Sequence, residues 1–424
     1  MGQARTRLLL FQVPLLAVLL GSACLPPPAR QEVHTGHWHA WLDSPGGPLP
    51  FGLELWIPAA KPRAVLVNGV ERIDASRIEA HPGHVLISID HYDSFIEATV
   101  SDDGRQMHGL WEKTGGEGKK SRLPFHATAG ERPRFESEGR APVGSLAKRW
   151  RVDFDSSDDP AVGIFESDDS GIVQGTFLTT TGDYRYLEGR FDGTRLRLSC
   201  FDGAHAFLFD ATLQADGTLH GEFWSRDSWH ETWTARADPD ATLPDAFELT
   251  RWVEGADLAQ LEFPDLDGEL HSLADPAFAG RARIIEIFGS WCPNCNDAIP
   301  FLVELDRRYR DRGLSVLGLA FELTGEFQRD ADQVRTYAVH HDVRFPLLLA
   351  GTYDKAEASK SFPLIDRVRS FPTTIFLHGD GRVRAVHTGY AGPATGDANR
   401  ALRADFEELV EELLADDEST GGQG

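Results

Sequence analysis

The feature that most constrains the fold of this chain is a pair of cysteines at the end of an apolar run. The motif Trp291-Cys292-Pro293-Asn294-Cys295 follows Ile284-Ile285-Glu286-Ile287-Phe288, a run typical of a central strand with both faces covered. Pro293 suits a first helical turn, because proline has no N–H to leave unpaired. A spacing of three places both sulfur atoms on one side of that turn, close enough to bridge. The sequence therefore predicts a strand, a cysteine pair and a helix in direct succession.

The order of the two cysteines predicts a different role for each. Cys292 lies where unpaired backbone N–H groups and the helix dipole favour negative charge, which stabilises a thiolate. The thiolate is the attacking species in thiol–disulfide exchange. We therefore expect Cys292 to be the exposed nucleophile and Cys295 to be the buried thiol that resolves the mixed disulfide.

Two other interpretations of the pair are weaker. A structural zinc site would need two further ligands at close spacing, and only Cys200 or scattered histidines could supply them. A static disulfide at this spacing would close so small a loop that it would constrain the chain little. Cys200 itself lies on a predicted strand and is expected to be a buried, inert thiol. The sequence indicates no metal ion and no other cofactor.

Beyond a polar connector at residues 238–253, strands alternate with helices, which predicts an α/β domain over residues 254–415. Apolar residues between Leu402 and Leu414 recur at three-to-four-residue spacing and indicate a final amphipathic helix. Residues 416–424 are acidic and then glycine-rich, and we expect them to be disordered. The other predicted elements are strands at Arg283–Phe288, Leu314–Phe321, Phe345–Leu349, Thr373–Leu377 and Val383–His387, and helices at Cys295–Arg310 and Ala331–His341.

Several ordered motifs make this region resemble the thioredoxin-fold proteins. Residues 284–295 are similar to their active-site segment, and Pro300, five residues past the second cysteine, matches the kink of their active-site helix. Ser370-Phe371-Pro372-Thr373-Thr374 resembles the loop that carries their cis-proline. The additional helix and strand between residues 331 and 349, together with an export signal, resemble the TlpA-like or ResA-like membrane-anchored branch. The resemblance covers about residues 254–414 and does not extend to the N-terminal half.

This resemblance implies a thiol–disulfide oxidoreductase of the bacterial cell envelope, with reduction as the expected direction. Its substrates would be disulfide-containing proteins, and a membrane thiol reductase would return electrons to the cysteine pair. The resemblance also implies a cis peptide bond before Pro372, with Phe371 against the sulfur atoms. Trp291, Pro293 and Pro300 are the other residues expected to support the site.

Glu286 is the most specific candidate beside the cysteines. An acid in an apolar strand costs on the order of several kcal/mol if it stays charged and unpaired, so its presence requires an explanation. Glu286 matches the place of the buried acid beneath the resolving cysteine of thioredoxins. We expect it to accept the proton of Cys295 when that thiol attacks, with a pKa raised by burial. The alternative is an outward-facing Glu286 paired with Arg281 or Arg283.

The motif departs from its relatives at two positions. Ala298 stands where many relatives carry glutamate, and Asn294 stands where many carry proline, so no relative's reduction potential can be transferred. A thiol peroxidase is an alternative because peroxiredoxins have a related fold. Their peroxidatic cysteine follows a Pro-x-x-x-Thr/Ser-x-x-Cys motif. Here Glu286 stands where that proline would fall, and Ser290 stands two rather than three residues before Cys292. Peroxidase activity is therefore disfavoured.

Residues 32–237 form short alternating runs separated by turns such as Asp103-Gly104, Asp192-Gly193 and Asp216-Gly217. This pattern predicts an all-β domain, either an antiparallel barrel or a sandwich. A weak repetition relates residues 98–111 to residues 211–224 and indicates a duplicated meander. The alternative function for the whole chain is therefore an envelope lipoprotein whose β domain binds a ligand or partner, with an ancillary redox domain.

The first 24 residues have the pattern of an export signal. Arg5 and Arg7 precede an apolar run at Leu8–Leu20 that is too short and too interrupted to span a bilayer. Small residues then lead into Cys24, as in a lipobox, so we expect lipid on Cys24 and a proline-rich tether at residues 25–31. The alternative is an ordinary cleaved signal with an incidental cysteine. The formal net charge of -24 disfavours nucleic acid as a partner. The sequence therefore predicts a protein that faces the periplasm and is anchored to a membrane.

Overall fold

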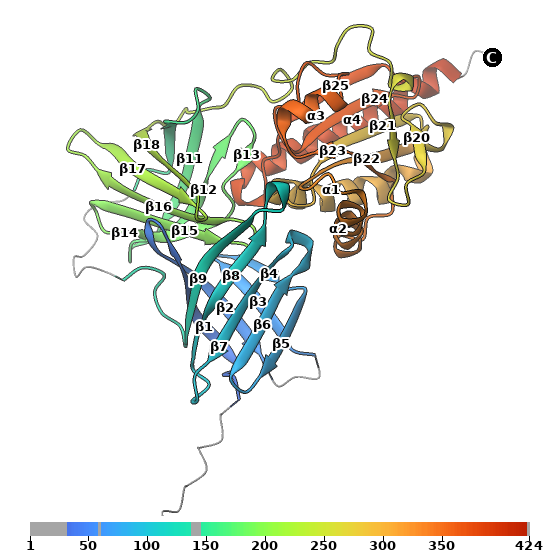
Figure 1. Ribbon diagram of the computed structural model, residues 1–424. Coiled ribbons are helices and arrows are strands. Elements are labelled where there is room, and N and C mark those ends of the chain that lie inside the picture. Colours follow the sequence, from blue (N-terminus) through green and yellow to red (C-terminus); the bar gives the residue numbers. More distant parts are fainter. Residues whose placement is uncertain (1–31, 58–60, 137–145, 422–424) are drawn as a thin grey trace, which may run out of the picture.

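The computed structural model describes residues 32–57, 61–136 and 146–421, with side chains described as far as residue 415. We call residues 32–237 the β half and residues 254–415 the α/β half, and Figure 1 shows the two lying against each other. This order of an all-β part and a thioredoxin-like α/β part confirms the predicted fold class. The expected export signal, Cys24 and the proline-rich tether lie outside the described residues.

The first sheet of the β half is a nine-stranded antiparallel meander in the order β4-β3-β2-β1-β9-β8-β7-β6-β5. On β1 the side chains of Trp38, Ala40 and Leu42 are buried, while those between them are half-buried, as expected when one face of a sheet packs on a core. Its strands are β1 (Gly36–Ser44), β2 (Gly47–Trp56), β3 (Arg63–Asn68), β4 (Glu71–Asp74), β5 (Arg77–His81), β6 (His84–Ile89), β7 (Ser94–Val100), β8 (Gln106–Thr114) and β9 (Lys120–Ala129).

The second sheet has the order β11-β10-β18-β17-β16-β15-β14-β12-β13 and closes on itself, because β11 also pairs with β12. This barrel encloses a core of aromatic side chains that includes Phe177, Phe209 and Trp233. Its strands are β10 (Arg149–Phe154), β11 (Ala161–Ser167), β12 (Ile172–Thr179), β13 (Gly182–Asp183), β14 (Leu187–Phe191), β15 (Arg195–Phe201), β16 (Ala206–Leu213), β17 (Thr218–Ser225) and β18 (Trp229–Ala237).

The repeated sequence segments lie on equivalent hairpins of the two sheets. The first spans β7 and β8, and the second spans β16 and β17. At the turns, Gly104 (φ +70°) and Gly217 (φ +84°) adopt the left-handed conformation that favours glycine. The repetition is therefore accounted for by two hairpins of the same kind.

The α/β half contains a five-stranded sheet in the order β23-β22-β21-β24-β25. The central strand β21 pairs in parallel with β22 and antiparallel with β24, and all seven of its residues are buried, which explains its continuous apolar run. The sheet strands are β21 (Ala282–Phe288), β22 (Leu314–Glu322), β23 (Leu347–Thr352), β24 (Thr373–His378) and β25 (Val383–Thr388), preceded by the hairpin β19 (Glu262–Pro264) and β20 (Leu270–Ser272). The helices are α1 (Pro293–Tyr309), α2 (Phe327–His340), α3 (Lys355–Ser361) and α4 (Asp397–Gly421).

Two helices differ from the expectation. α3 was not predicted, because its seven residues include a single buried side chain, Ala358, and therefore show no apolar periodicity. α4 extends to Gly421, so residues 416–421, which we expected to be disordered, are helical; extending an existing helix is easier than nucleating one. Among the described residues, no helix is both long and apolar enough to span a membrane.

Candidate redox-active site

The cysteine pair lies at the junction of β21 and α1, as predicted. Cys292 is the N-cap of α1, and its Sγ accepts a hydrogen bond from the Cys295 N–H at 3.4 Å. Both cysteines are free thiols. Cys295 is 1% exposed, in accordance with its expected role, but Cys292 is only 6% exposed. The expectation of an exposed Cys292 is therefore wrong for this structure, because the β half packs against the same end of α1.

The loop before β24 closes one side of the pair. The peptide bond between Phe371 and Pro372 is cis, as predicted, and the Cys292 thiol lies 3.3 Å from the Phe371 carbonyl oxygen, to which it donates. Trp291 lies edge-on to the Phe371 ring, and its indole N–H donates to the Phe321 carbonyl at 2.8 Å. Pro300 lies inside α1 and is exposed. The structure thus brings Trp291, Pro293, Phe371 and Pro372 together around Cys292, whereas Pro300 takes no part in this contact.

Glu286 lies on β21 and is 1% exposed. The Thr374 hydroxyl donates to its carboxyl group at 2.7 Å, and burial raises the pKa of Glu286 to about 8. Burial also raises the pKa of the Cys295 thiol, and a negative charge on Glu286 raises it further. Arg281 and Arg283 donate instead to the carbonyl groups of Leu414 and Leu273. The outward-facing alternative for Glu286 is therefore wrong.

A second buried acid, Glu322, was missed by the sequence analysis. It ends β22, is fully buried, and accepts hydrogen bonds from the Ser290 N–H at 2.8 Å and the Ser290 hydroxyl at 2.7 Å. Burial raises the pKa of Glu322 to about 7. The available signal was the same as for Glu286, an acid at the end of the apolar run Leu314–Phe321. Glu322 fixes the residue that leads into Trp291 and Cys292.

Polar side chains make hydrogen bonds to the backbone at the start of α1. The Asn296 amide donates to the carbonyl groups of Ser290 (3.1 Å) and Cys292 (2.9 Å), and its oxygen lies 2.7 Å from His341 Nε2. The Tyr337 hydroxyl donates to the Cys295 carbonyl at 3.2 Å. These contacts fix the first turn of α1, which carries both cysteines.

The β half supplies the remaining wall of the site. Arg185, whose side chain is 6% exposed, forms an ion pair with Asp297 and donates to the Pro293 carbonyl at 3.5 Å. Its backbone has φ +62°, a conformation rare for residues with a side chain. Asp183 accepts the Arg185 N–H at 2.7 Å and the Gly392 N–H at 2.6 Å. The sequence contains no local signal that would pair these distant residues.

One further cluster of side chains has the ligand types and spacing of an ion site. Asp265, Glu269 and His271 cluster on the β19–β20 hairpin, where Asp265 also accepts the N–H groups of its own turn. That cluster includes neither cysteine of the pair. Cys200 is buried in the core of the second sheet, as expected of an inert thiol.

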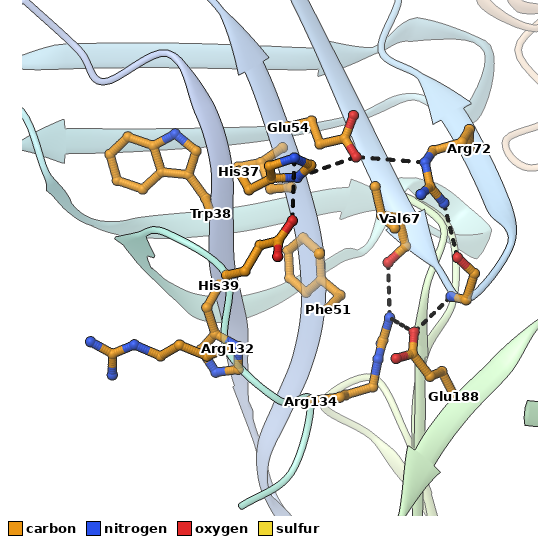
Figure 2. Close-up of a pocket in the computed structure, with 14 residues that line it drawn as sticks. His37, Trp38, His39, Phe51, Glu54, Val67, Arg72, Arg132, Arg134 and Glu188 are labelled. Carbon is orange, nitrogen blue, oxygen red and sulfur yellow. Dashed lines mark hydrogen bonds and ion pairs between the residues drawn. The ribbon is translucent and has the colours of Figure 1, made fainter. Parts of the chain in front are cut away.

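The β half also contains a cavity of about 270 Å³ between β1, β2 and the neighbouring barrel. Figure 2 shows that most of its charged side chains are paired within its own wall. Glu54 lies 3.4 Å from His37 and 3.6 Å from Arg72, and Arg134 donates to the Val67 carbonyl and to Glu188. All the residues that line it belong to the β half.

Comparisons with known proteins match the C-terminal part of this chain. Residues 236–402 match the Redoxin family, which places a Redoxin domain in the C-terminal part of the chain. The thioredoxin-like protein YneN of Bacillus subtilis is 28% identical over 136 residues, which cover 32% of this chain and 72% of YneN. The thiol-disulfide oxidoreductase ResA of Bacillus thuringiensis subsp. konkukian is 27% identical over 124 residues, which cover 28% of this chain and 60% of ResA. The match thus spans less than two thirds of ResA.

A solved structure of a thiol:disulfide interchange protein from Chlorobium tepidum is also similar. It is 24% identical, covers 36% of this chain and 92% of its own, and has a TM-score of 0.28. The family match begins at residue 236 and so lies beyond the strands of the two β sheets, apart from the last two residues of β18.

Proposed function

We propose that this protein is a thiol–disulfide oxidoreductase that works by exchange at Cys292 and Cys295. The observation that carries the proposal is the arrangement of the pair, with Cys292 capping α1, Cys295 behind it, and Glu286 buried in the adjoining strand with a pKa raised to about 8. The similarity to the thiol-disulfide oxidoreductase ResA supports the same class of reaction. The substrates are disulfide-containing molecules, and we propose proteins among them.

The reaction follows from two successive displacements. The Cys292 thiolate attacks one sulfur of the substrate disulfide, forms a mixed disulfide and releases the other substrate sulfur as a thiolate, which takes a proton. Cys295 then loses its proton and attacks the Cys292 sulfur, which releases the second substrate sulfur. The substrate gains two electrons and two protons, and the cysteine pair becomes a disulfide.

In this scheme Glu286 is the proton acceptor for Cys295. A carboxyl group whose pKa is about 8 can both take up and return a proton near neutral pH, which an ordinary glutamate cannot do efficiently. Trp291, Pro293, Phe371 and Pro372 support the site by fixing the surroundings of Cys292. These residues bind or position groups and do not exchange electrons themselves.

We also propose reduction as the working direction and the cell envelope as the location. The export-signal pattern and the lipobox-like Cys24 support this location, and a lipid on Cys24 would anchor the protein to a membrane. In an oxidising compartment the pair needs a supply of electrons, and a membrane thiol reductase would provide it.

The experiment that tests the activity is trapping of the mixed disulfide. Cys295→Ser should accumulate a covalent complex with a disulfide substrate such as insulin, because the resolving thiol is missing, whereas Cys292→Ser should accumulate none. Cys200→Ser is the matched control and should turn over insulin like the unsubstituted protein. Equal trapping by the Cys292 and Cys295 variants would contradict the assigned roles.

The same assay separates this proposal from its alternatives. Absence of disulfide turnover would favour a ligand- or partner-binding protein, for which the cavity in Figure 2 is the candidate site. Rapid consumption of peroxide by Cys292 without disulfide turnover would favour a thiol peroxidase.

A further inference from the structure

The segment between β12 and β14 contacts Asn294, which lies between the two cysteines, and Ser370, which precedes Phe371. A Cβ atom added to Gly182 would lie 1.7 Å from Asn294 Nδ2, so the Gly182 backbone is in contact with the residue just before Cys295. On the other side of the site, the Ser370 hydroxyl donates to the Thr181 carbonyl at 2.8 Å. Ser370 immediately precedes Phe371, whose carbonyl contacts Cys292. The turn at residues 180–183 thus touches both walls between which a substrate must reach Cys292.

The contact around this turn is polar. Arg185 donates to Glu71 of the first sheet at 2.6 Å, lies 3.4 Å from Asp202 of the second sheet, and pairs with Asp297 of α1. If the halves separated, Arg185 would keep its two carboxylates within the β half, and Asp297 would gain water. Separation would therefore leave Arg185 paired and Asp297 hydrated.

Further polar contacts surround the same interface. Arg369 pairs with Asp159 at 3.1 Å, and Arg329 pairs with Asp93. The Glu117 N–H donates to the Leu323 carbonyl at 2.9 Å. Each of these contacts joins one residue of the β half to one of the α/β half.

The apolar cores show the same division. The buried apolar cluster of the α/β half contains residues 258–414 only, with no member from the β half. In contrast, the cluster of the first sheet includes Phe201, Ala206 and Leu208 of the second barrel, so the two β sheets share a core. A polar interface without a shared apolar core is the kind across which domains move, whereas the two β sheets should move as one body.

We propose that the β half is a separable cover that selects substrates of the redox site by size. This inference rests on the proposed function and adds to it. While the cover is closed, the turn at residues 180–183 limits access to Cys292, so that small molecules reach the thiol and a bulky disulfide reacts only after the halves separate. Arg185 and Gly182 are the residues of the β half that determine this access.

The test compares two reagents with the same reactive group, N-ethylmaleimide and a maleimide that carries a long polyethylene glycol chain. Their rates are measured on the reduced full chain by loss of the unmodified peptide that contains Cys292. The variant is Asp159→Arg, which places a cation opposite Arg369 and lies outside the redox machinery. Asp158→Arg is the matched control, because it makes the same charge change at an exposed neighbour.

Asp159→Arg should raise the rate with the large maleimide about tenfold, equal to about 1.4 kcal/mol in the opening equilibrium. It should change the rate with N-ethylmaleimide by less than about twofold, since tenfold selectivity must come from access and not from thiol reactivity. Asp158→Arg should change neither rate, and adding Arg369→Asp to Asp159→Arg should restore the low rate with the large reagent.

Equal rates of the two reagents on the unsubstituted protein would overturn the inference, as would a parallel rise of both rates in Asp159→Arg. Turnover is then measured with bis(2-hydroxyethyl) disulfide and with insulin, and Asp159→Arg should accelerate only insulin. If neither disulfide is turned over by any variant, the proposed function fails, while the maleimide rates still report whether the cover exists.

Discussion

Replacing Glu286 by glutamine should stabilise the protein while slowing its chemistry. The folded state raises the pKa of Glu286 from 4.5 to about 8, so between these values it holds a proton that the unfolded chain has released. The stability of the unsubstituted protein therefore falls as the pH rises from 4.5 to about 8. Glutamine has no proton to hold and can still accept the Thr374 hydrogen bond.

The size of this stability difference follows from the number of pH units between pH 7 and the ordinary glutamate pKa of 4.5. Over 2.5 pH units at about 1.36 kcal/mol per unit, Glu286→Gln should be more stable by about 3 kcal/mol at pH 7 and by almost nothing at pH 4.5. Urea unfolding at several pH values, followed by tryptophan fluorescence, measures this difference. The matched control is Glu262→Gln on an exposed position of β19, which should change the unfolding free energy by less than about 0.5 kcal/mol throughout.

The same variant should separate the two chemical steps. Attack by Cys292 on a disulfide should proceed nearly as before, whereas resolution by Cys295 should slow by about a hundredfold, the usual contribution of a positioned proton acceptor. Rapid-quench analysis of the mixed disulfide distinguishes these steps. A stability difference that does not vary with pH, or equal slowing of both steps, would refute the assignment of Glu286.

Two further predictions follow from other parts of the chain. Burial lowers the pKa of His91 to about 2 and of His341 to about 3, and His340, Lys113 and Asp202 face His91. Below pH 6.5 the unfolded chain therefore binds protons that the folded protein does not, and the free energy of unfolding should fall by up to about 1.4 kcal/mol per pH unit for each histidine. Replacing His91 by glutamine should reduce that slope in acid unfolding. In its native host the mature protein should begin at a lipidated Cys24, and mass spectrometry that finds an unmodified terminus there, or cleavage beyond it, would contradict the anchor.

Much of the redox site could be predicted because its signals are local in the sequence. An apolar run covered on both faces, a proline at the first helical position and a spacing of three fix the strand, the helix and the cysteine pair within fifteen residues of each other. Glu286 could be singled out because an unpaired charge in a buried apolar strand is energetically costly. The loop at Phe371 and Pro372 was found by resemblance and not by a physical signal.

The surroundings of Cys292 could not be predicted because they come from the β half. Arg185 and Pro293 are 108 residues apart, and a single arginine near a turn has no pattern that identifies its partner. The expectation of an exposed Cys292 considered only the end of the α/β sheet and took no account of the β half. It failed because the turn at residues 180–183 occupies that end. Predicting burial from sequence requires knowing which surfaces meet.

The structure also explains why alanine stands at position 298, where many relatives carry glutamate. Ala298 is 3% exposed and packs in the core of the α/β half, whereas Asp297, one residue earlier on α1, meets Arg185. Successive helix residues point about 100° apart, so Asp297 faces the β half while Ala298 faces the core. While the halves are in contact, Asp297 pairs with Arg185, which Glu71 and Asp202 also contact. The proposed cover therefore both limits access to Cys292 and supplies the ion-pair partner of Asp297.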